Sequence, residues 1–215
     1  MSDKINFKLF KPFGSTLAKA ELPLQLIKDF KDDLKAIRED KQKKKDHNWG
    51  DRLIGSVSAE YLVTPSVMLK WKRQFFDPII VSYTNAHYKQ EKVKSVLINS
   101  AWYVVSKPGD YNPLHNHCEY IKGSNYDLSC VGYLSLPDSM IPTQNAKSHN
   151  DYSAQIQFVE GSENKFSDSQ LRIDPKVRDW YLFPNYLMHS VYSFNCEDKN
   201  SERVSFSFNA TINFE

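Results

Sequence analysis

The order of helical and strand-like patterns along the chain is the strongest constraint on its fold. Apolar residues recur at helical spacing from about residue 22 to residue 42, and again from Val63 to Tyr88. From Val93 onward the chain consists of short strand-like runs separated by turns rich in Pro, Gly, Asn and Asp. Helices first and strands afterwards predict a mostly β, α+β protein in which N-terminal helices pack on an antiparallel sheet or barrel-like sandwich.

The length and composition fit one globular domain. The chain has 215 residues, of which 40% are hydrophobic and 13% aromatic, so it can bury a proper core and is not a disordered chain. We therefore expect a single domain over residues 1–215. Residues 1–92 are expected to supply mainly helical support, and residues 93–215 the strand-rich core with the site.

The charge and the cysteines indicate where the protein works. A net charge of +2 gives no electrostatic reason to expect nucleic acid or an anionic membrane as a partner. The sequence has no apolar run long enough to span a bilayer and no signal-peptide core at its N-terminus. Three cysteines, at positions 118, 130 and 196, show no disulfide framework. We expect a cytoplasmic protein with free thiols.

Three metal-binding side chains alternate in the segment Gly109–Glu119, which reads GDYNPLHNHCE. If this segment is a strand, His115, His117 and Glu119 point to one face. A further histidine, His189, follows an apolar run about 70 residues later. A non-heme Fe(II) site needs such a facial set of three protein ligands, with open positions left for substrate and O2.

An arginine with a polar strand face follows in the segment RVSFSFN, which begins at Arg203. Polar residues at positions 203, 205, 207 and 209 alternate with Val204, Phe206 and Phe208. If the polar face points inward it lines a pocket, and the guanidinium can hold the carboxylate of an acidic cosubstrate through two hydrogen bonds. The alternative is a solvated strand face with a salt-bridged arginine.

The order of these motifs resembles that of 2-oxoglutarate/Fe(II)-dependent oxygenases. The closest pattern is that of a small, prolyl-hydroxylase-like branch common in phages, and the resemblance covers roughly residues 95–215. The matching motifs are Trp102, Gly109, His115-x-His117, GYLSLP from Gly132 to Pro137, LFPNYLMH from Leu182 to His189, and Arg203-x-Ser205. The resemblance implies a double-stranded β-helix, or jelly roll, with supporting helices. It also implies Fe(II), 2-oxoglutarate as cosubstrate and O2, and suggests that ascorbate stimulates turnover.

The resemblance leaves two ligand sets open. The usual His-x-Asp/Glu pattern of these oxygenases gives His117, Glu119 and His189. The branch with His-x-His gives His115, His117 and His189, and we favour this second set. Glu119 is then either a ligand or a carboxylate that orients a histidine.

The resemblance also assigns the cosubstrate contacts. Arg203 is expected to bind the far carboxylate of 2-oxoglutarate, and Ser205 to add a hydroxyl donor. Tyr133 matches a strand tyrosine that often hydrogen bonds to the same carboxylate, although ordinary packing explains it as well. The loop from Ser139 to Asn150 is long enough to close over the site, or it is a surface excursion.

The implied reaction is hydroxylation of a C–H bond with release of succinate and CO2. A peptidyl substrate of prolyl type is the first choice, with a small molecule as the next and a nucleobase disfavoured by the near-neutral charge. Two other function classes stay open. A cupin-type metal-dependent dioxygenase or isomerase would use the histidines and Glu119 but leaves Arg203 unexplained, and a jelly-roll binding or virion module would use no metal.

Overall fold

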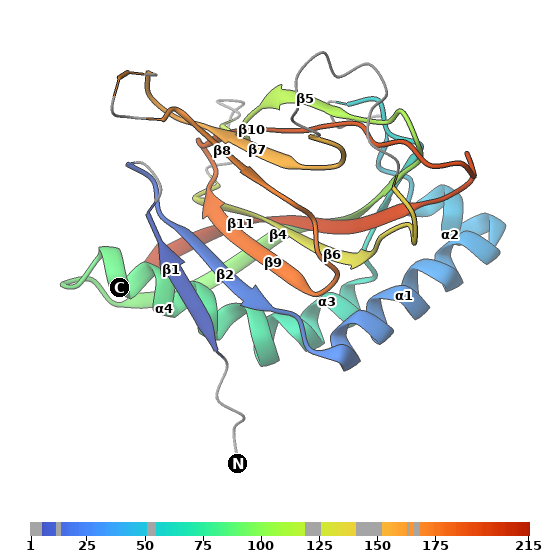
Figure 1. Ribbon diagram of the computed structural model, residues 1–215. Helices are drawn as coiled ribbons and strands as arrows, with labels where there is room; N and C mark the ends of the chain where they lie inside the picture. Colours follow the sequence, from blue (N-terminus) through green and yellow to red (C-terminus); the bar gives the residue numbers. More distant parts are fainter. Residues whose placement is uncertain are drawn as a thin grey trace.

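The computed structural model describes residues 6–11, 14–50, 55–118, 126–140, 152–162, 164–165 and 168–215. In this part of the chain two antiparallel sheets lie on top of each other, and the helices cover the outer face of the larger sheet (Figure 1). This is the mostly β architecture of a jelly roll with supporting helices, as the sequence predicts. No helix within the described ranges is long and apolar enough to cross a membrane.

The helices lie between residues 24 and 87. They are α1 (Leu24–Glu39), α2 (Lys41–Asp46), α3 (Pro65–Trp71), a π-helical turn (Lys72–Phe76) and α4 (Asp77–His87). The buried residues of α1 recur every three or four positions, which is the pattern that predicts it.

Both predicted helices are interrupted. The first ends at Glu39, because the side chain of Asp40 accepts from the backbone N–H groups of Gln42 and Lys43 and so caps a separate short helix. The second contains a π-helical turn just before Pro78, which has no backbone N–H to donate.

The larger sheet has seven strands in the order β1-β2-β9-β6-β11-β4-β3. Their bounds are Phe7–Phe10, Leu17–Glu21, Asp179–Pro184, Leu128–Ser135, Arg203–Phe214, Val93–Ser106 and Ala59–Leu62, in that spatial order. Three of these strands, β1, β2 and β3, lie within residues 1–92, where the sequence predicts mainly helical support.

The smaller sheet has four strands in the order β5-β10-β7-β8. They span Asn112–His115, Met188–Val191, Ile156–Val159 and Gln170–Ile173. A second apolar cluster lies between the two sheets, formed by residues such as Phe158 of β7 and Phe183 of β9.

Strand β11 separates the main hydrophobic core, which lies between the helices and the larger sheet, from the space between the two sheets. Its apolar residues face the helices: the Phe206 ring lies 4.8 Å from that of Phe30, and the Phe208 ring 4.9 Å from that of Phe76. Phe206 also leaves no room for a side chain at position 132 of the neighbouring strand, since a Cβ there would lie 2.3 Å from its ring. The alternate residues of β11 therefore face the smaller sheet.

Candidate metal and cosubstrate site

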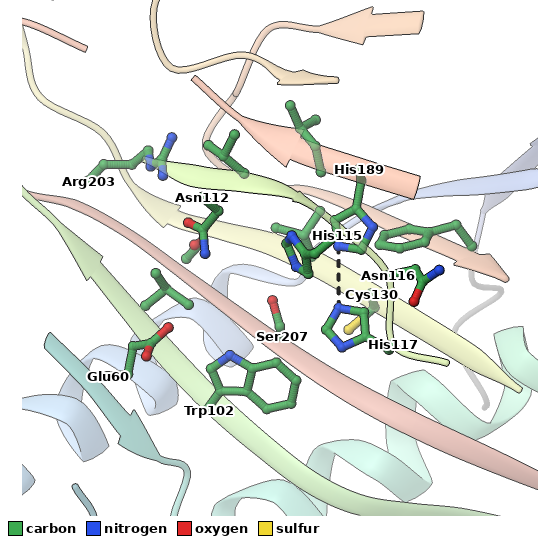
Figure 2. A pocket seen from close by; sticks show the side chains of 16 residues that line it. Glu60, Trp102, Asn112, His115, Asn116, His117, Cys130, His189, Arg203 and Ser207 are labelled. Atoms are coloured by element: carbon green, nitrogen blue, oxygen red, sulfur yellow. Dashed lines mark hydrogen bonds between the residues drawn. The ribbon is translucent and has the colours of Figure 1, made fainter. Parts of the chain in front are cut away.

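Three histidines meet between the two sheets. His115 ends β5, His189 lies directly opposite it on β10, and His117 follows two residues after β5. One ring nitrogen of each histidine lies within 4.8 Å of the corresponding nitrogens of the other two, and the Nε2 atoms of His117 and His189 are 3.3 Å apart (Figure 2). Side chains that are remote in sequence thus form one three-nitrogen cluster.

In two of the three rings, Nδ1 forms a hydrogen bond with a backbone carbonyl. His115 Nδ1 lies 2.7 Å from the carbonyl oxygen of Pro113, and His189 Nδ1 lies 2.9 Å from that of Leu187. A carbonyl only accepts, so each Nδ1 donates a proton and each Nε2 keeps a free lone pair. This is the tautomer in which a histidine binds a metal through Nε2.

The third ring contacts Asn209 of β11. The Asn209 Nδ2 atom lies 3.5 Å from His117 Nδ1, while Asn209 Oδ1 accepts from the hydroxyl of Ser129 at 2.7 Å. A 180° rotation of the amide would exchange these two roles and let Oδ1 accept from His117 Nδ1. In both orientations of its amide, Asn209 contacts and orients the ring of His117. The sequence placed Asn209 on the polar face of β11 but did not indicate this role.

Burial keeps the histidine cluster neutral. Burial lowers the pKa of His117 to about 4, with a further contribution from His115. Burial, and then the two other rings, hold the pKa of His189 well below its usual value. Burial also lowers the pKa of His115, partly opposed by its hydrogen bond to Pro113. Neutral imidazole is the form that binds metal ions.

Arg203, the first residue of β11, is buried, with 2% of its surface exposed. It lines a cavity that the three histidines also line. Its two terminal nitrogens donate to the Ala154 carbonyl oxygen and the Ser106 hydroxyl, both at 3.2 Å, and its Nε has no partner. No ion pair joins it to any residue that the structure describes. A buried cation with an unsatisfied donor is suited to an anionic ligand, because burial without a partner is costly.

Ser205 and Tyr133 lie near this arginine. Ser205 lines the cavity, and Tyr133 of β6 stands directly opposite it in the sheet register. Burial raises the pKa of Tyr133, and the charge of Arg203 opposes this rise. The phenol of Tyr133 therefore stays protonated and interacts electrostatically with the guanidinium of Arg203.

The cavity has a volume of about 100 Å³ and lies between the sheets. Its walls carry the three histidines, Arg203 and Ser205, together with Glu60, Trp102, Asn112, Asn116 and Ser207, among others. The sequence did not point to Glu60 or to the two asparagines, and it marked Trp102 only as a motif of the family resemblance. Glu119, and residues 141–150 of the expected lid, lie outside the described residues.

The residues present fit Fe(II) and a dicarboxylate. The three neutral imidazoles form a facial set of nitrogen donors. The guanidinium of Arg203, which has no ion pair within the described residues, is suited to a carboxylate in the same cavity. The family model described as "Putative 2OG-Fe(II) oxygenase" matches residues 100–209. The chain belongs to the 2OG-Fe(II) oxygenase family. It is thus a 2-oxoglutarate-dependent, non-heme iron dioxygenase, and its family implies Fe(II) and 2-oxoglutarate.

Solved structures share this fold at low sequence identity. A Pseudomonas putida prolyl-4-hydroxylase aligns over 90% of this chain and 91% of its own, with 12% identity and a TM-score of 0.59. The viral collagen prolyl hydroxylase of Paramecium bursaria Chlorella virus-1 aligns over 97% of both chains, with 12% identity and a TM-score of 0.52. HygX from Streptomyces hygroscopicus, solved with nickel and 2-oxoglutarate, covers 97% of this chain and 83% of its own, with 12% identity and a TM-score of 0.53. No curated protein matches the sequence.

Proposed function

We propose that this oxygenase hydroxylates a C–H bond of a peptidyl, prolyl-type side chain or of a small molecule. In this reaction one atom of O2 enters the substrate as a hydroxyl group. The other is used as 2-oxoglutarate loses CO2 and becomes succinate. The observation that carries the proposal is the three-histidine cluster in one cavity with the unpaired, buried Arg203.

The proposed metal ligands are His115, His117 and His189. When bound there, iron would supply the activation of O2. The carbonyls of Pro113 and Leu187 hold two of the rings so that Nε2 faces the centre of the cluster. Glu119 stays a candidate fourth ligand or an acceptor for a ring N–H.

The proposed cosubstrate contacts are Arg203, Ser205 and Tyr133. The guanidinium would bind the carboxylate of 2-oxoglutarate that is remote from the histidines, because its Nε–H is free and its planar fork matches a carboxylate. The hydroxyl of Ser205 and the protonated phenol of Tyr133 would donate to the same group. The surrounding sheets keep bulk water away and strengthen these contacts.

The substrate is supported only by similarity. Two of the similar structures are a prolyl-4-hydroxylase and a collagen prolyl hydroxylase, which favours a peptidyl, prolyl-type substrate. HygX, which has a similar fold, was solved with nickel and 2-oxoglutarate bound. Stimulation by ascorbate belongs to the same proposal.

The test combines metal analysis with cosubstrate binding. Purified protein is loaded anaerobically with Mn(II), and 2-oxoglutarate is titrated by calorimetry with and without the metal. We expect one metal per chain, 2-oxoglutarate binding that depends on it, and succinate formation with Fe(II) and O2. Metal binding without 2-oxoglutarate binding would favour a cupin-type enzyme, and no metal binding would favour a binding module.

The ligand set is tested by two alanine variants. His115→Ala and Glu119→Ala are compared for Mn(II) stoichiometry. Loss of the metal in the first variant alone supports the three-histidine set. Loss in the second alone contradicts it and favours His117, Glu119 and His189.

A further inference from the structure

One carboxylate in the cavity has no role in binding iron or 2-oxoglutarate. Glu60 lies on the edge strand β3, has 2% of its surface exposed and lines the cavity. Glutamate is almost never this buried unless it is paired. Figure 2 shows its carboxylate beside Trp102, on the side of the cavity formed by the larger sheet.

The Glu60 carboxylate has no partner within the described ranges. No ion pair or side-chain hydrogen bond reaches it there, and burial alone raises its pKa to about 7. Burying an ionisable group without a hydrogen bond or ion pair costs free energy, and no described contact of Glu60 offsets this cost. Such a group at a ligand cavity points to a bound partner.

Arg203 does not serve as that partner. The charges that act on the Arg203 guanidinium are those of Tyr133 and Asp110, and the pKa of Glu60 responds to burial only. The cavity therefore holds a cation and a carboxylate at separate points. The cation is already matched to 2-oxoglutarate, so the carboxylate is available to a second molecule.

We propose that Glu60 binds a cationic group of the primary substrate, an aliphatic ammonium or a guanidinium, carried by a peptide side chain or by a free amine. This inference rests on the proposed function, because it assigns a substrate to the same cavity. Trp102 lines the same cavity, and the face of an indole ring attracts cations.

The strand register gives the geometry. Glu60 is paired with Val104, so Trp102 is its diagonal neighbour on the same face, and the Cβ atoms of such neighbours lie somewhat less than about 7–8 Å apart. The Trp102 ring in turn lies 6.2 Å from that of His117. A cation at Glu60 would thus be separated from the reacting carbon near the histidines by a short aliphatic chain.

The experiment compares matched charged and neutral probes. Acetylated tripeptides Gly-Lys-Gly and Gly-norleucine-Gly, their Arg and citrulline counterparts, and butylamine against butanol are titrated into Mn(II)-loaded protein with 2-oxoglutarate. The proteins are the parent, Glu60→Gln and the control Glu39→Gln, whose side chain is exposed on α1. We expect the parent to bind at least one cationic probe at least about 10-fold more tightly than its neutral partner, since breaking a buried charge pair costs more than this factor.

The preference should disappear in Glu60→Gln and persist in Glu39→Gln. Peptide probes outperforming butylamine would identify the source of the cation as a protein side chain, and the reverse would identify a free amine. Equal binding of charged and neutral probes by the parent, no binding of any probe, or a preference that survives Glu60→Gln would overturn the inference. Glu60→Asp keeps the charge on a shorter arm, so it should retain part of the preference if Glu60→Gln folds poorly.

The same samples separate this inference from the proposed function. Each titration is repeated without 2-oxoglutarate. If 2-oxoglutarate fails to bind while the charge preference of the parent persists, the oxygenase assignment of the site fails and the cation subsite stands. If 2-oxoglutarate binds and the preference is absent, only the cation subsite fails.

Discussion

Glu60→Gln should make the metal-free protein more stable at alkaline pH and leave it almost unchanged near pH 4. Burial raises the pKa of Glu60 to about 7 in the fold, against about 4.3 in an unfolded chain. The folded state therefore binds this proton more tightly. The stability that the protonated carboxyl contributes is fully present below pH 4.3 and is lost as the pH rises through 7.

The magnitude follows from the two pKa values. At about 1.4 kcal/mol per pKa unit, ionising Glu60 in the fold costs at most about 4 kcal/mol above pH 7. Glutamine has nearly the same shape and no charge to bury. Glu60→Gln should therefore gain up to about 4 kcal/mol at pH 8, or roughly 8–16 °C in Tm for a chain of this size.

The assay is thermal and urea unfolding at pH 4, 5, 6, 7 and 8 for the parent, Glu60→Gln and the exposed control Glu39→Gln. The histidine cluster is the same in all three proteins, so its contribution to the pH dependence cancels in the differences. The gain of Glu60→Gln over the parent should grow with pH, and that of the control should stay near zero. A gain that is flat across this range would refute the uncompensated burial of Glu60.

Three further outcomes concern the metal and the cosubstrate. Arg203→Ala should weaken 2-oxoglutarate binding to the Mn(II)-loaded protein about 30-fold or more, and Arg203→Lys should recover only part of it; equal calorimetric affinities would remove Arg203 from the site. His189→Ala should abolish stoichiometric Mn(II) binding. The control His47→Ala should keep it, because His47 lies outside the cluster and its Nδ1 contacts the carbonyl of Leu62. Metal binding retained by His189→Ala would place the site elsewhere. Asn209→Ala should lower the metal affinity by about 10- to 100-fold in a competition with a chelator, and an unchanged affinity would exclude its role in orienting His117.

The alternation of β11 could be predicted because it is local. Side chains in a strand point to opposite faces in turn, so Arg203, Ser205 and Ser207 had to share a face wherever the strand lay. The hydrophobic residues between them decided which face was buried against the helices. Whether the polar face points inward stayed open in the sequence, and the structure places these three side chains at the cavity between the sheets.

Glu60 could not be predicted, because its burial depends on contacts remote in sequence. It lies in a four-residue strand, AEYL, that becomes visible only when paired with β4 at the edge of the sheet. A glutamate is normally exposed. Asn209 was in the predicted polar face, but its contact with His117 depends on how the chain after β5 folds back over β11.

Stability and binding measured together distinguish a ligand site from an architectural one. If Arg203 and Glu60 were each other's partner, removing either would leave a buried charge unpaired and destabilise the protein by several kcal/mol. Because they are not paired, glutamine should be tolerated or favoured at position 60 in the metal-free protein, whereas a neutral residue at position 203 loses two hydrogen bonds but leaves no carboxylate unpaired. A loss of ligand binding without a loss of stability is then the result that only a functional role explains. The two charges should also act on different molecules, so Glu60→Gln should leave 2-oxoglutarate affinity intact, and Arg203→Ala should leave the preference for cationic probes intact.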